Sequence, residues 1–241
     1  MLEKWLQESN YTVILTGAGM STESGLPDFR SANNGLWNGK DPGKIASTEA
    51  LNENVNEFIE FYRHRVIGLK ECNPHKGHYI LADWEKRDII KSIITQNVDG
   101  FHGLAGSKKV SELHGNLQTL HCQKCKKEFP SEGYLHGQFQ CNCGGVLRPS
   151  VVLFGEMLPE EALDFAEDET EKAELFIVLG SSLNVTPANQ FPLIAKQNGA
   201  KLVIINLEPT DFDIYADEVI HNRKIGEVLE DLDRVFNSEK T

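Results

Sequence analysis

The chain has 241 residues, of which 40% are hydrophobic and 25% charged, as in an ordinary soluble globular protein. Its 24 Lys and Arg against 36 Asp and Glu give a formal charge of −12, which disfavours binding to a nucleic-acid backbone or an anionic bilayer. No apolar run approaches the roughly 18 residues of a membrane span, and the N-terminus lacks the pattern of a secretion signal. We therefore expect a cytoplasmic chain without membrane or direct nucleic-acid partners.

Four apolar runs typical of strands recur along the chain, each followed by a turn and a helical segment. They lie at residues 11–16, 89–95, 175–179 and 201–206. This alternation predicts an α/β fold with a Rossmann-like, mostly parallel sheet that is covered by helices on both faces.

Two insertions interrupt the pattern. Residues 36–87 begin as polar, glycine-rich chain and turn helical at about 48–69 and 74–87, whereas residues 117–147 hold four clustered cysteines. We expect the two insertions to form a smaller lobe beside a large domain made of residues 1–35, 88–116 and 148–241.

Glycines occupy the turn after the first strand, at Gly17, Gly19 and Gly25. Such a turn lets backbone N–H groups approach an anion such as a pyrophosphate, although glycines can also serve only a tight turn. The spacing differs from the G-x-G-x-x-G of dinucleotide oxidoreductases, and no acidic strand end follows about 20 residues later. An ordinary dehydrogenase is therefore disfavoured.

The turn continues into a longer motif, Gly17-Ala18-Gly19-Met20-Ser21-Thr22-Glu23-Ser24-Gly25-Leu26-Pro27-Asp28-Phe29-Arg30. This segment resembles the first signature of the sirtuin family, the NAD-dependent protein lysine deacylases, in its bacterial-type minimal catalytic core. The resemblance implies that Ala18, Thr22, Phe29 and Arg30 contact NAD. It also implies a mobile loop, from Arg30 to about Lys44, that closes over NAD.

A polar segment, Thr95-Gln96-Asn97-Val98-Asp99, follows the second strand, where open α/β sheets bind ligands. A helix N-cap by Asp99 or Asn97 would explain one of these side chains. The resemblance to sirtuins implies that Gln96 and Asn97 bind the nicotinamide ribose and that Val98 and Asp99 hold the carboxamide.

His114 lies in the segment Leu113-His114-Gly115 at the end of a short apolar strand. Histidine titrates near neutrality and is the usual general base, but a lone histidine is more often a surface or core residue. The matching sirtuin motif implies that His114 is the catalytic base beside NAD, with Asn97 as a second catalytic residue.

Four cysteines fall within 22 positions, at Cys122, Cys125, Cys141 and Cys143. Two Cys pairs can close a tetrahedral zinc site with no open position, which predicts one structural zinc ion. Two disulfides, redox chemistry at the first pair, or His121 as a substitute ligand are the alternatives. Cys72 stands apart and has no assigned role.

The remaining motifs concern the substrate and the adenosine half of NAD. An apolar strand at 148–156 resembles the sirtuin wall that pairs with substrate peptides, which implies that Val152 and Phe154 line the acyl-lysine tunnel, facing residues 183–185. The resemblance also implies that NAD phosphates and adenosine contact Ser181, Ser182, Asn206, Leu207 and Ile225. Ile225 is equally a helix start.

Tyr62 and Arg65 are three residues apart in the helical insertion and share one helix face. A phenol and a guanidinium together can bind a carboxylate, and sirtuins that remove succinyl or malonyl groups carry such a pair. A packed tyrosine beside a solvent-facing arginine is the alternative.

The prediction is an NAD-dependent protein lysine deacylase acting on acyl-lysine proteins or peptides. An NAD-dependent ADP-ribosyltransferase and a non-enzymatic NAD-sensing zinc module are the alternatives. The net charge comes from two acidic patches, residues 160–174 and 208–218, with the rest of the chain balanced. The first patch either attracts basic segments beside a substrate lysine or is only a solvated helix face.

Overall fold

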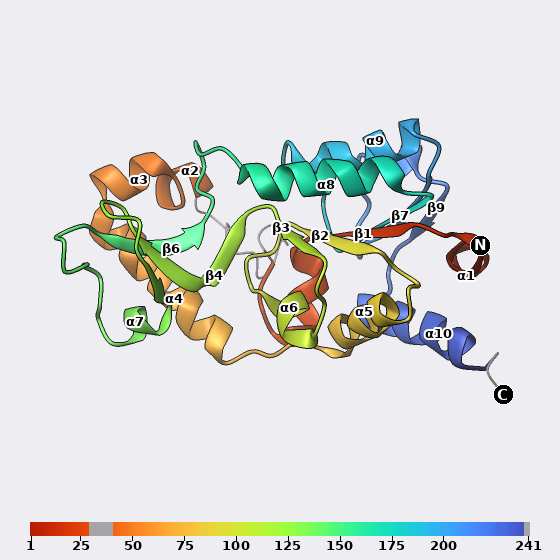
Figure 1. Cartoon of the computed structure of the whole chain (residues 1–241), viewed down its shortest axis with the longest axis horizontal. Coiled ribbons are helices and arrows are strands. Elements are labelled where there is room, and N and C mark those ends of the chain that lie inside the picture. Colours follow the sequence, from red (N-terminus) through yellow and green to blue (C-terminus); the bar gives the residue numbers. More distant parts are fainter. Residues whose placement is uncertain (29–40, 239–241) are drawn as a thin grey trace.

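The computed structural model describes residues 1–28 and 41–238. A six-stranded parallel sheet forms its centre (Figure 1), as the strand and helix alternation predicts. Across the sheet the strands are β3 (Val110–Glu112), β2 (Ser92–Thr95), β1 (Thr12–Thr16), β7 (Leu175–Leu179), β8 (Lys201–Ile205) and β9 (Glu218–Ile220). The neighbours of the central β1 come from distant parts of the chain, so the strand order reverses beside β1.

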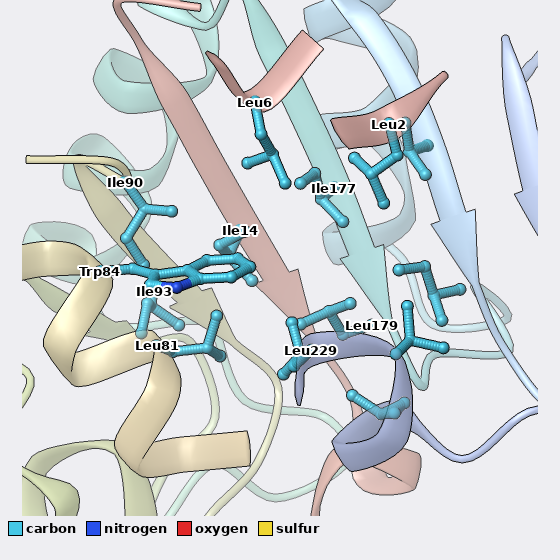
Figure 2. Close-up of a cluster of buried hydrophobic side chains, with 14 of the residues drawn as sticks. Leu2, Leu6, Ile14, Leu81, Trp84, Ile90, Ile93, Ile177, Leu179 and Leu229 are labelled. Atoms are coloured by element: carbon cyan, nitrogen blue, oxygen red, sulfur yellow. The ribbon is translucent and has the colours of Figure 1, made fainter. Parts of the chain in front are cut away.

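Helices cover both faces of this sheet, which explains why β1 and β7 are buried at every position. Side chains alternate along β1: Ile14 packs with α1 (Leu2–Glu8), α5 (Lys76–Lys86) and α10 (Ile225–Ser238), and Val13 packs with α8 (Glu160–Lys172) and α9 (Phe191–Gln197). Figure 2 shows Trp84 of α5 and Leu229 of α10 on the first of these faces, near Ile14.

The two insertions share a separate hydrophobic core at the end of the molecule away from both termini (Figure 1). One contributes α2 (Pro42–Ile45), α3 (Thr48–Glu53) and α4 (Val55–Lys70). The other contributes β4 (Gly115–Cys122), β5 (Glu128–Pro130) and α7 (Glu132–Leu135), and β4 lies between β5 and β6 (Leu147–Val151) in an antiparallel sheet.

Two elements pack differently from what the expected lobe boundaries imply. Leu81 and Trp84 of α5 are fully buried in the core of the parallel sheet, so this helix does not pack with the rest of the helical insertion. Strand β6 pairs with β4 across the cysteine segment and not with the large sheet. The division into lobes stays a prediction, and this packing favours boundaries before residue 76 and after residue 151.

The remaining elements are short: α6 (Phe101–Ala105) and the 3₁₀ helices η1 (Ala18–Ser24), η2 (Ala188–Gln190) and η3 (Asp213–Tyr215). Strand β9 was not expected from the sequence, because it has only three residues and none of them is fully buried. Among the described residues, no helix is long and apolar enough to cross a bilayer.

Candidate active site

A cavity of about 620 Å³ opens at the carboxyl ends of the parallel strands. Its lining includes the segments that follow β1, β2, β7 and β8, namely residues 17–19, 96–98, 180–182 and 206–208. Open α/β sheets bind ligands at this edge, where the strand order reverses. The structure therefore brings together motifs that are far apart in the sequence.

Three glycines let two of these segments touch through their backbones. The N–H of Gly17 donates to the carbonyl of Leu179 at 3.0 Å, and that of Gly19 to Gly180 at 2.9 Å. A Cβ added to Gly180, whose φ is +62°, would lie 2.5 Å from the backbone nitrogen of Met20. These two amides hold the turn on the sheet and are therefore not free to bind an anion. Ala18, which lies between them, lines the cavity, as does Ser182.

The segment after β2 is held by a buried hydrogen-bond network. Gln96 Nε2 donates to Ser181 Oγ at 2.9 Å, which ties β2 to β7 across β1. Asn97 Nδ2 donates to Ser21 Oγ at 3.3 Å, and Ser21 donates to Asp99 Oδ2 at 2.7 Å. Asp99 also accepts from the N–H of Phe101 at the start of α6, so the carboxylate has the capping role considered from the sequence as well as a place in the site.

Asn97 and Asp99 are about 95% inaccessible to solvent, with 5% and 6% exposed. Burial raises the pKa of Asp99, against the hydrogen bonds from Phe101 and Ser21 and the charge of Arg65. Such tightly held polar groups are pre-organised for a ligand, because they need not rearrange to bind it.

His114 lines the same cavity, and its tautomer follows from its partner. Its Nδ1 lies 2.9 Å from the carbonyl oxygen of Gln96. A carbonyl can only accept, so Nδ1 carries the proton and Nε2 keeps a free lone pair. Burial lowers the pKa of His114, although the Gln96 carbonyl opposes this, so the ring is neutral at physiological pH. These are the properties of a general base.

Two histidines that the sequence reading passed over complete the network beneath this site. His78 and His102 are 0% and 2% exposed. His102 Nε2 lies 3.0 Å from Thr16 Oγ1, and His78 Nε2 lies 3.5 Å from Ser21 Oγ. Burial lowers their pKa values to about 2 for His78 and about 3 for His102, so both are neutral. Nothing in the sequence signals that these rings are buried.

The segment after β6 forms one wall of the cavity, including Val152 and Phe154. The N–H of Val152 donates to the carbonyl of His114 at 2.9 Å, which links this wall to the proposed base. An ion pair of 2.6 Å between Arg148 of β6 and Glu156 joins the strand to this segment. Glu156 also accepts a hydrogen bond from the N–H of Leu153. Of the expected facing wall, residues 183–185, Val185 also lines the cavity.

Tyr62 and Arg65 of α4 also line this cavity. The Arg65 guanidinium carbon lies 5.7 Å from the centre of the Tyr62 ring, and Tyr62 is 2% exposed. Burial raises the pKa of the Tyr62 phenol, which keeps its O–H as a donor. Burial lowers the pKa of Arg65, and Tyr62 and Asp99 counter this. Both side chains line the cavity, and Arg65 is half-buried. The arginine is therefore not the purely solvent-facing residue of the alternative interpretation.

The cavity lining also contains all the remaining described residues for which the resemblance implied contact with NAD. These are Ala18, Thr22, Ser181, Ser182, Asn206, Leu207 and Ile225. Ile225 both lines the cavity and begins α10, so the two interpretations of it are compatible. Arg223 and Lys224 also line the cavity, although the sequence did not suggest them as site residues. Phe29, Arg30 and most of the expected mobile loop lie outside the described residues.

A second cavity of about 480 Å³ adjoins the first. The two share Ala18, Arg65, Asn97 and Val98, and the second is also lined by Asp99. The second cavity therefore lies against the buried hydrogen-bond network of Ser21, Asn97 and Asp99.

The four clustered cysteines form a site that suits one zinc ion. All four sulfur atoms lie within 4.8 Å of one another. The Sγ atoms of Cys122 and Cys143 are 3.4 Å apart and those of Cys125 and Cys141 3.7 Å apart, far longer than a disulfide bond. Zinc to sulfur bonds of about 2.3 Å in a tetrahedron place sulfurs about 3.8 Å apart. The Cys122 sulfur also accepts from two backbone N–H groups.

The donor set explains why this zinc would be structural. Four thiolates fill a tetrahedral site and leave no position for water. His121 bonds Ser150 and is not in the cluster, so it does not replace a cysteine. A Cβ on Gly145 would lie 2.5 Å from the Cys122 sulfur, which is why glycine follows the second cysteine pair.

Comparison with known proteins agrees with this geometry. A model of the Sir2 family matches residues 17–187. A protein of Oceanobacillus iheyensis named NAD-dependent protein deacetylase is 66% identical over 229 residues, covering 95% of this chain and 97% of that protein. A solved complex of Sir2 with a p53 peptide and NAD+ is 37% identical, with a TM-score of 0.87, covering 98% of this chain and 97% of the other.

A further solved structure contains Sir2 with a deacetylated p53 peptide and 3'-O-acetyl ADP-ribose. It is 38% identical, with a TM-score of 0.90, and covers 95% of this chain and 94% of the other. The resemblance to sirtuins is confirmed, and the chain belongs to the Sir2 family.

Proposed function

We propose that this chain is an NAD-dependent protein lysine deacylase that releases nicotinamide and O-acyl-ADP-ribose. The observation that carries the proposal is a neutral, buried His114 with a free Nε2, set in the cavity between the segments after β2 and β6. The names of its relatives support the proposal, since the Oceanobacillus iheyensis protein is called an NAD-dependent protein deacetylase.

The lining residues divide the cavity between the two substrates. Ala18, Thr22 and the group Ser181, Ser182, Asn206, Leu207 and Ile225 would hold the phosphates and adenosine of NAD. Gln96 and Asn97 would hold the nicotinamide ribose. Val98 and Asp99 would hold the carboxamide in the second cavity. Lys224 supplies a cation at the phosphate end.

The substrate lysine would enter along the wall made by Val152 and Phe154, whose aliphatic and aromatic side chains suit the lysine stem. The acyl oxygen forms a bond to C1′ of the ribose as the bond to nicotinamide breaks. His114 Nε2 then takes a proton from a ribose hydroxyl, the 2′-oxygen bonds to the acyl carbon, and the bond from that carbon to the lysine nitrogen breaks, which releases free lysine. Water then adds to the acyl carbon and its bond to the 1′-oxygen breaks, which leaves 2′-O-acyl-ADP-ribose with a free 1′-hydroxyl. Because the acyl group moves from lysine to ADP-ribose, the enzyme is a transferase.

The proposal is tested with an acetyl-lysine peptide and NAD. Nicotinamide, free lysine peptide and O-acetyl-ADP-ribose should form in equal amounts. His114→Ala should lose turnover by at least about a hundredfold, the usual contribution of a general base, while His136→Ala, an exposed histidine, should not. Full activity in His114→Ala with an intact fold would refute the role of His114.

The same assay separates the alternative activities. Label from adenylate-labelled NAD that becomes attached to protein, without matching loss of acetyl groups, would indicate an ADP-ribosyltransferase. Binding of NAD without any turnover would indicate a non-enzymatic NAD-sensing module.

We further propose that acyl groups with a terminal acid, such as succinyl or malonyl, are accepted. The support is the placement of Tyr62 and Arg65 in the cavity, one as a neutral phenol donor and the other as a half-buried cation. A carboxylate would have to compete with Asp99, which already acts on the charge of Arg65. Because this competition weakens the attraction of Arg65 for an acyl carboxylate, we expect the uncharged acetyl group to remain a good substrate as well.

Arg65→Met tests the acyl preference. It should lower kcat/KM for succinyl-lysine peptide by about a hundredfold, the size of one buried charge-assisted hydrogen bond, with a smaller effect on acetyl-lysine peptide. Equal losses of kcat/KM with both peptides would show that Arg65 does not distinguish succinyl from acetyl groups.

A cytoplasmic location is also proposed. The support is the set of free, clustered thiols, which suit a metal site in a reducing compartment better than a secreted disulfide framework.

A further inference from the structure

His221 follows strand β9 and contacts two segments at the adenosine end of the cavity. Its Nδ1 lies 2.8 Å from the carbonyl oxygen of Asn206 at the end of β8. Its Nε2 lies 2.8 Å from Oδ2 of Asp213 in η3. The side chain is 24% exposed. The imidazole therefore bridges the end of β8 and the 3₁₀ helix η3 on the surface.

Both partners of His221 are acceptors. A carbonyl oxygen has no proton to give, and Asp213 already accepts from the N–H of Thr210 at 3.1 Å and from its hydroxyl at 2.7 Å. A neutral imidazole has one N–H and cannot donate from both nitrogens. The geometry therefore requires a protonated imidazolium paired with an ionised carboxylate.

The electrostatics of the pair agree with this assignment. The Asn206 carbonyl raises the pKa of His221 above its usual value. Burial opposes this rise, and the hydrogen bond and charge of Asp213 add to it. Burial would raise the pKa of Asp213, but hydrogen bonds from Thr210 and His221 outweigh it, and that pKa is lowered.

Several other charged residues in the segments that flank His221 are paired elsewhere, whereas Glu208, Asp211 and Lys224 form no ion pair in the described part of the chain. Asp217 pairs with Lys196 and Lys201, and Arg223 pairs with Asp231. Glu218 of β9 pairs with the N-terminal ammonium group. Within the described part of the chain, the imidazole forms its ion pair with Asp213.

Asn206 begins the turn that this bridge restrains. Its side chain donates to the carbonyl of Glu208 at 2.7 Å, and Asn206, Leu207 and Glu208 all line the cavity. The N–H of Asn222 donates to the carbonyl of Leu207, so residues on both sides of His221 hold the turn. His221 itself does not line the cavity.

We propose that protonated His221 is a positioning residue for NAD: by bridging Asn206 and Asp213 it holds the 206–208 turn in the shape that receives adenosine. The inference deepens the proposed function and rests on it. When the ring loses its proton, one of the two hydrogen bonds is lost and the turn loosens. Because the folded-state pKa is raised, the effect is full below the ordinary value near 6.5 and is lost as pH rises through the raised pKa.

The test is calorimetric titration of the whole protein with ADP-ribose between about pH 6 and pH 9, the range in which histidine changes charge. The dissociation constant should rise with pH in the wild-type protein. The pKa of His114 is lowered, so its own titration lies toward the acid end of this range, away from the raised pKa of His221. His221→Gln should bind about tenfold more weakly at pH 6, the size of one lost charge-assisted hydrogen bond, and show no pH dependence.

Asp213→Asn should weaken binding by a similar factor and lower the His221 pKa, followed by NMR titration of the imidazole, toward its ordinary value. The double variant should be no worse than either single variant, because both remove the same bridge. In steady-state assays KM for NAD should rise while kcat is unchanged. The exposed His136→Gln is the matched control and should behave as the wild type.

Wild-type affinity and pH dependence in His221→Gln, or additive losses in the double variant, would overturn the inference. A wild-type protein that binds no ADP-ribose would instead sink the proposed function. In that case an ordinary His221 pKa in the NMR titration of the free protein would overturn the bridge as well, and a raised pKa would leave the bridge in place.

Discussion

Gly180 shows how a single missing side chain shapes this site. Its φ is +62°, and an added Cβ would lie 2.5 Å from Met20 N and 2.7 Å from Gly19 Cα. Since both neighbours are backbone atoms in hydrogen-bonded segments, they cannot move aside cheaply. The glycine is needed for the contact between the β1 and β7 loops, and with it for the floor of the cavity.

We predict that Gly180→Ala lowers the free energy of unfolding by about 3 kcal/mol, from left-handed strain and overpacking together, and weakens ADP-ribose binding. Gly199→Ala is the matched control: its φ is +95° but no atom lies within 4 Å of the added Cβ. It should cost only about 1 kcal/mol, from strain alone. Urea denaturation measures both, and equal losses in the two variants would contradict the clash.

His78 and His102 make stability depend on pH. Their folded pKa values of about 2 and about 3 lie far below the ordinary value of 6.5. The unfolded chain therefore binds more protons below pH 6.5, and stability falls as pH falls from 6.5 toward the folded values.

Each of the two histidines should cost about 2 kcal/mol at pH 5 relative to pH 8. Denaturation at the two pH values measures the difference. His102→Gln should reduce the difference in the free energy of unfolding between pH 5 and pH 8 by about 2 kcal/mol, the contribution of one histidine. This holds whatever the variant does to stability at pH 8. His136→Gln, an exposed control, should keep the wild-type dependence. An unchanged dependence in His102→Gln would show that the ring is not buried and neutral.

At the scale of elements, the strands could be predicted because burial on both faces leaves continuous apolar runs. The expected run at 175–179 matches β7, and 201–206 matches β8 to within one residue. Strand β9 has no such run, since its three residues are only half-buried. The placement of α5 could not be predicted, because its apolar face fits either core and only the three-dimensional packing selects the sheet.

The candidate site divides in the same way. His114, Asn97 and the cysteines could be predicted because each lies in a short local motif. The bonds of Ser21 and His78 could not, because their partners are far away in the chain: Ser21 contacts Asp99, and His78 contacts Ser21 across 57 positions. A hydrogen bond of this kind leaves no local pattern. His221 bonds the nearer Asn206 and Asp213 but lies in no recognisable motif.

The zinc module is the element on which the catalytic wall depends. Strand β4 carries the zinc ligand Cys122 at one end and begins at Gly115, next to His114. Cys122 and Cys141 belong to the hydrophobic core shared by β4, β6 and α4. Loss of zinc should therefore disorder the wall near His114 as well as the cysteine turns.

We predict that Cys141→Ser binds no stable zinc, loses deacylation and unfolds at a lower temperature. Cys72→Ser, a free thiol outside the cluster, is the matched control and should keep one zinc per chain. Metal analysis and melting curves measure this. Fluorescence of Trp84, buried in the core of the parallel sheet, is read in a background in which Trp5 and Trp37 are replaced by Phe. It should stay native in Cys141→Ser at temperatures where activity is absent. A full equivalent of zinc in Cys141→Ser would contradict the four-cysteine site.

Across the whole molecule, the two acidic patches differ in how far they are neutralised. In residues 208–218, Asp213 bonds His221, Asp217 bonds two lysines and Glu218 bonds the N-terminus. In α8, Glu169 is buried against Tyr11 and Lys172. The exposed acids of this helix are Glu160, Glu161, Asp164, Glu167, Asp168 and Glu171. Helix α8 begins just after Leu158, which lines the cavity.

We predict that this exposed face attracts basic residues beside a substrate lysine. For a peptide with flanking lysines, kcat/KM should fall severalfold between about 50 mM and about 500 mM salt, whereas a peptide with flanking glycines should show little change. Neutralising Glu160 and Glu161 to Gln, nearest the cavity, should remove most of the salt dependence. Glu171→Gln, about 16 Å further along the helix, is the control and should keep it. Equal salt dependence in the two variants would mean that α8 is only a solvated face.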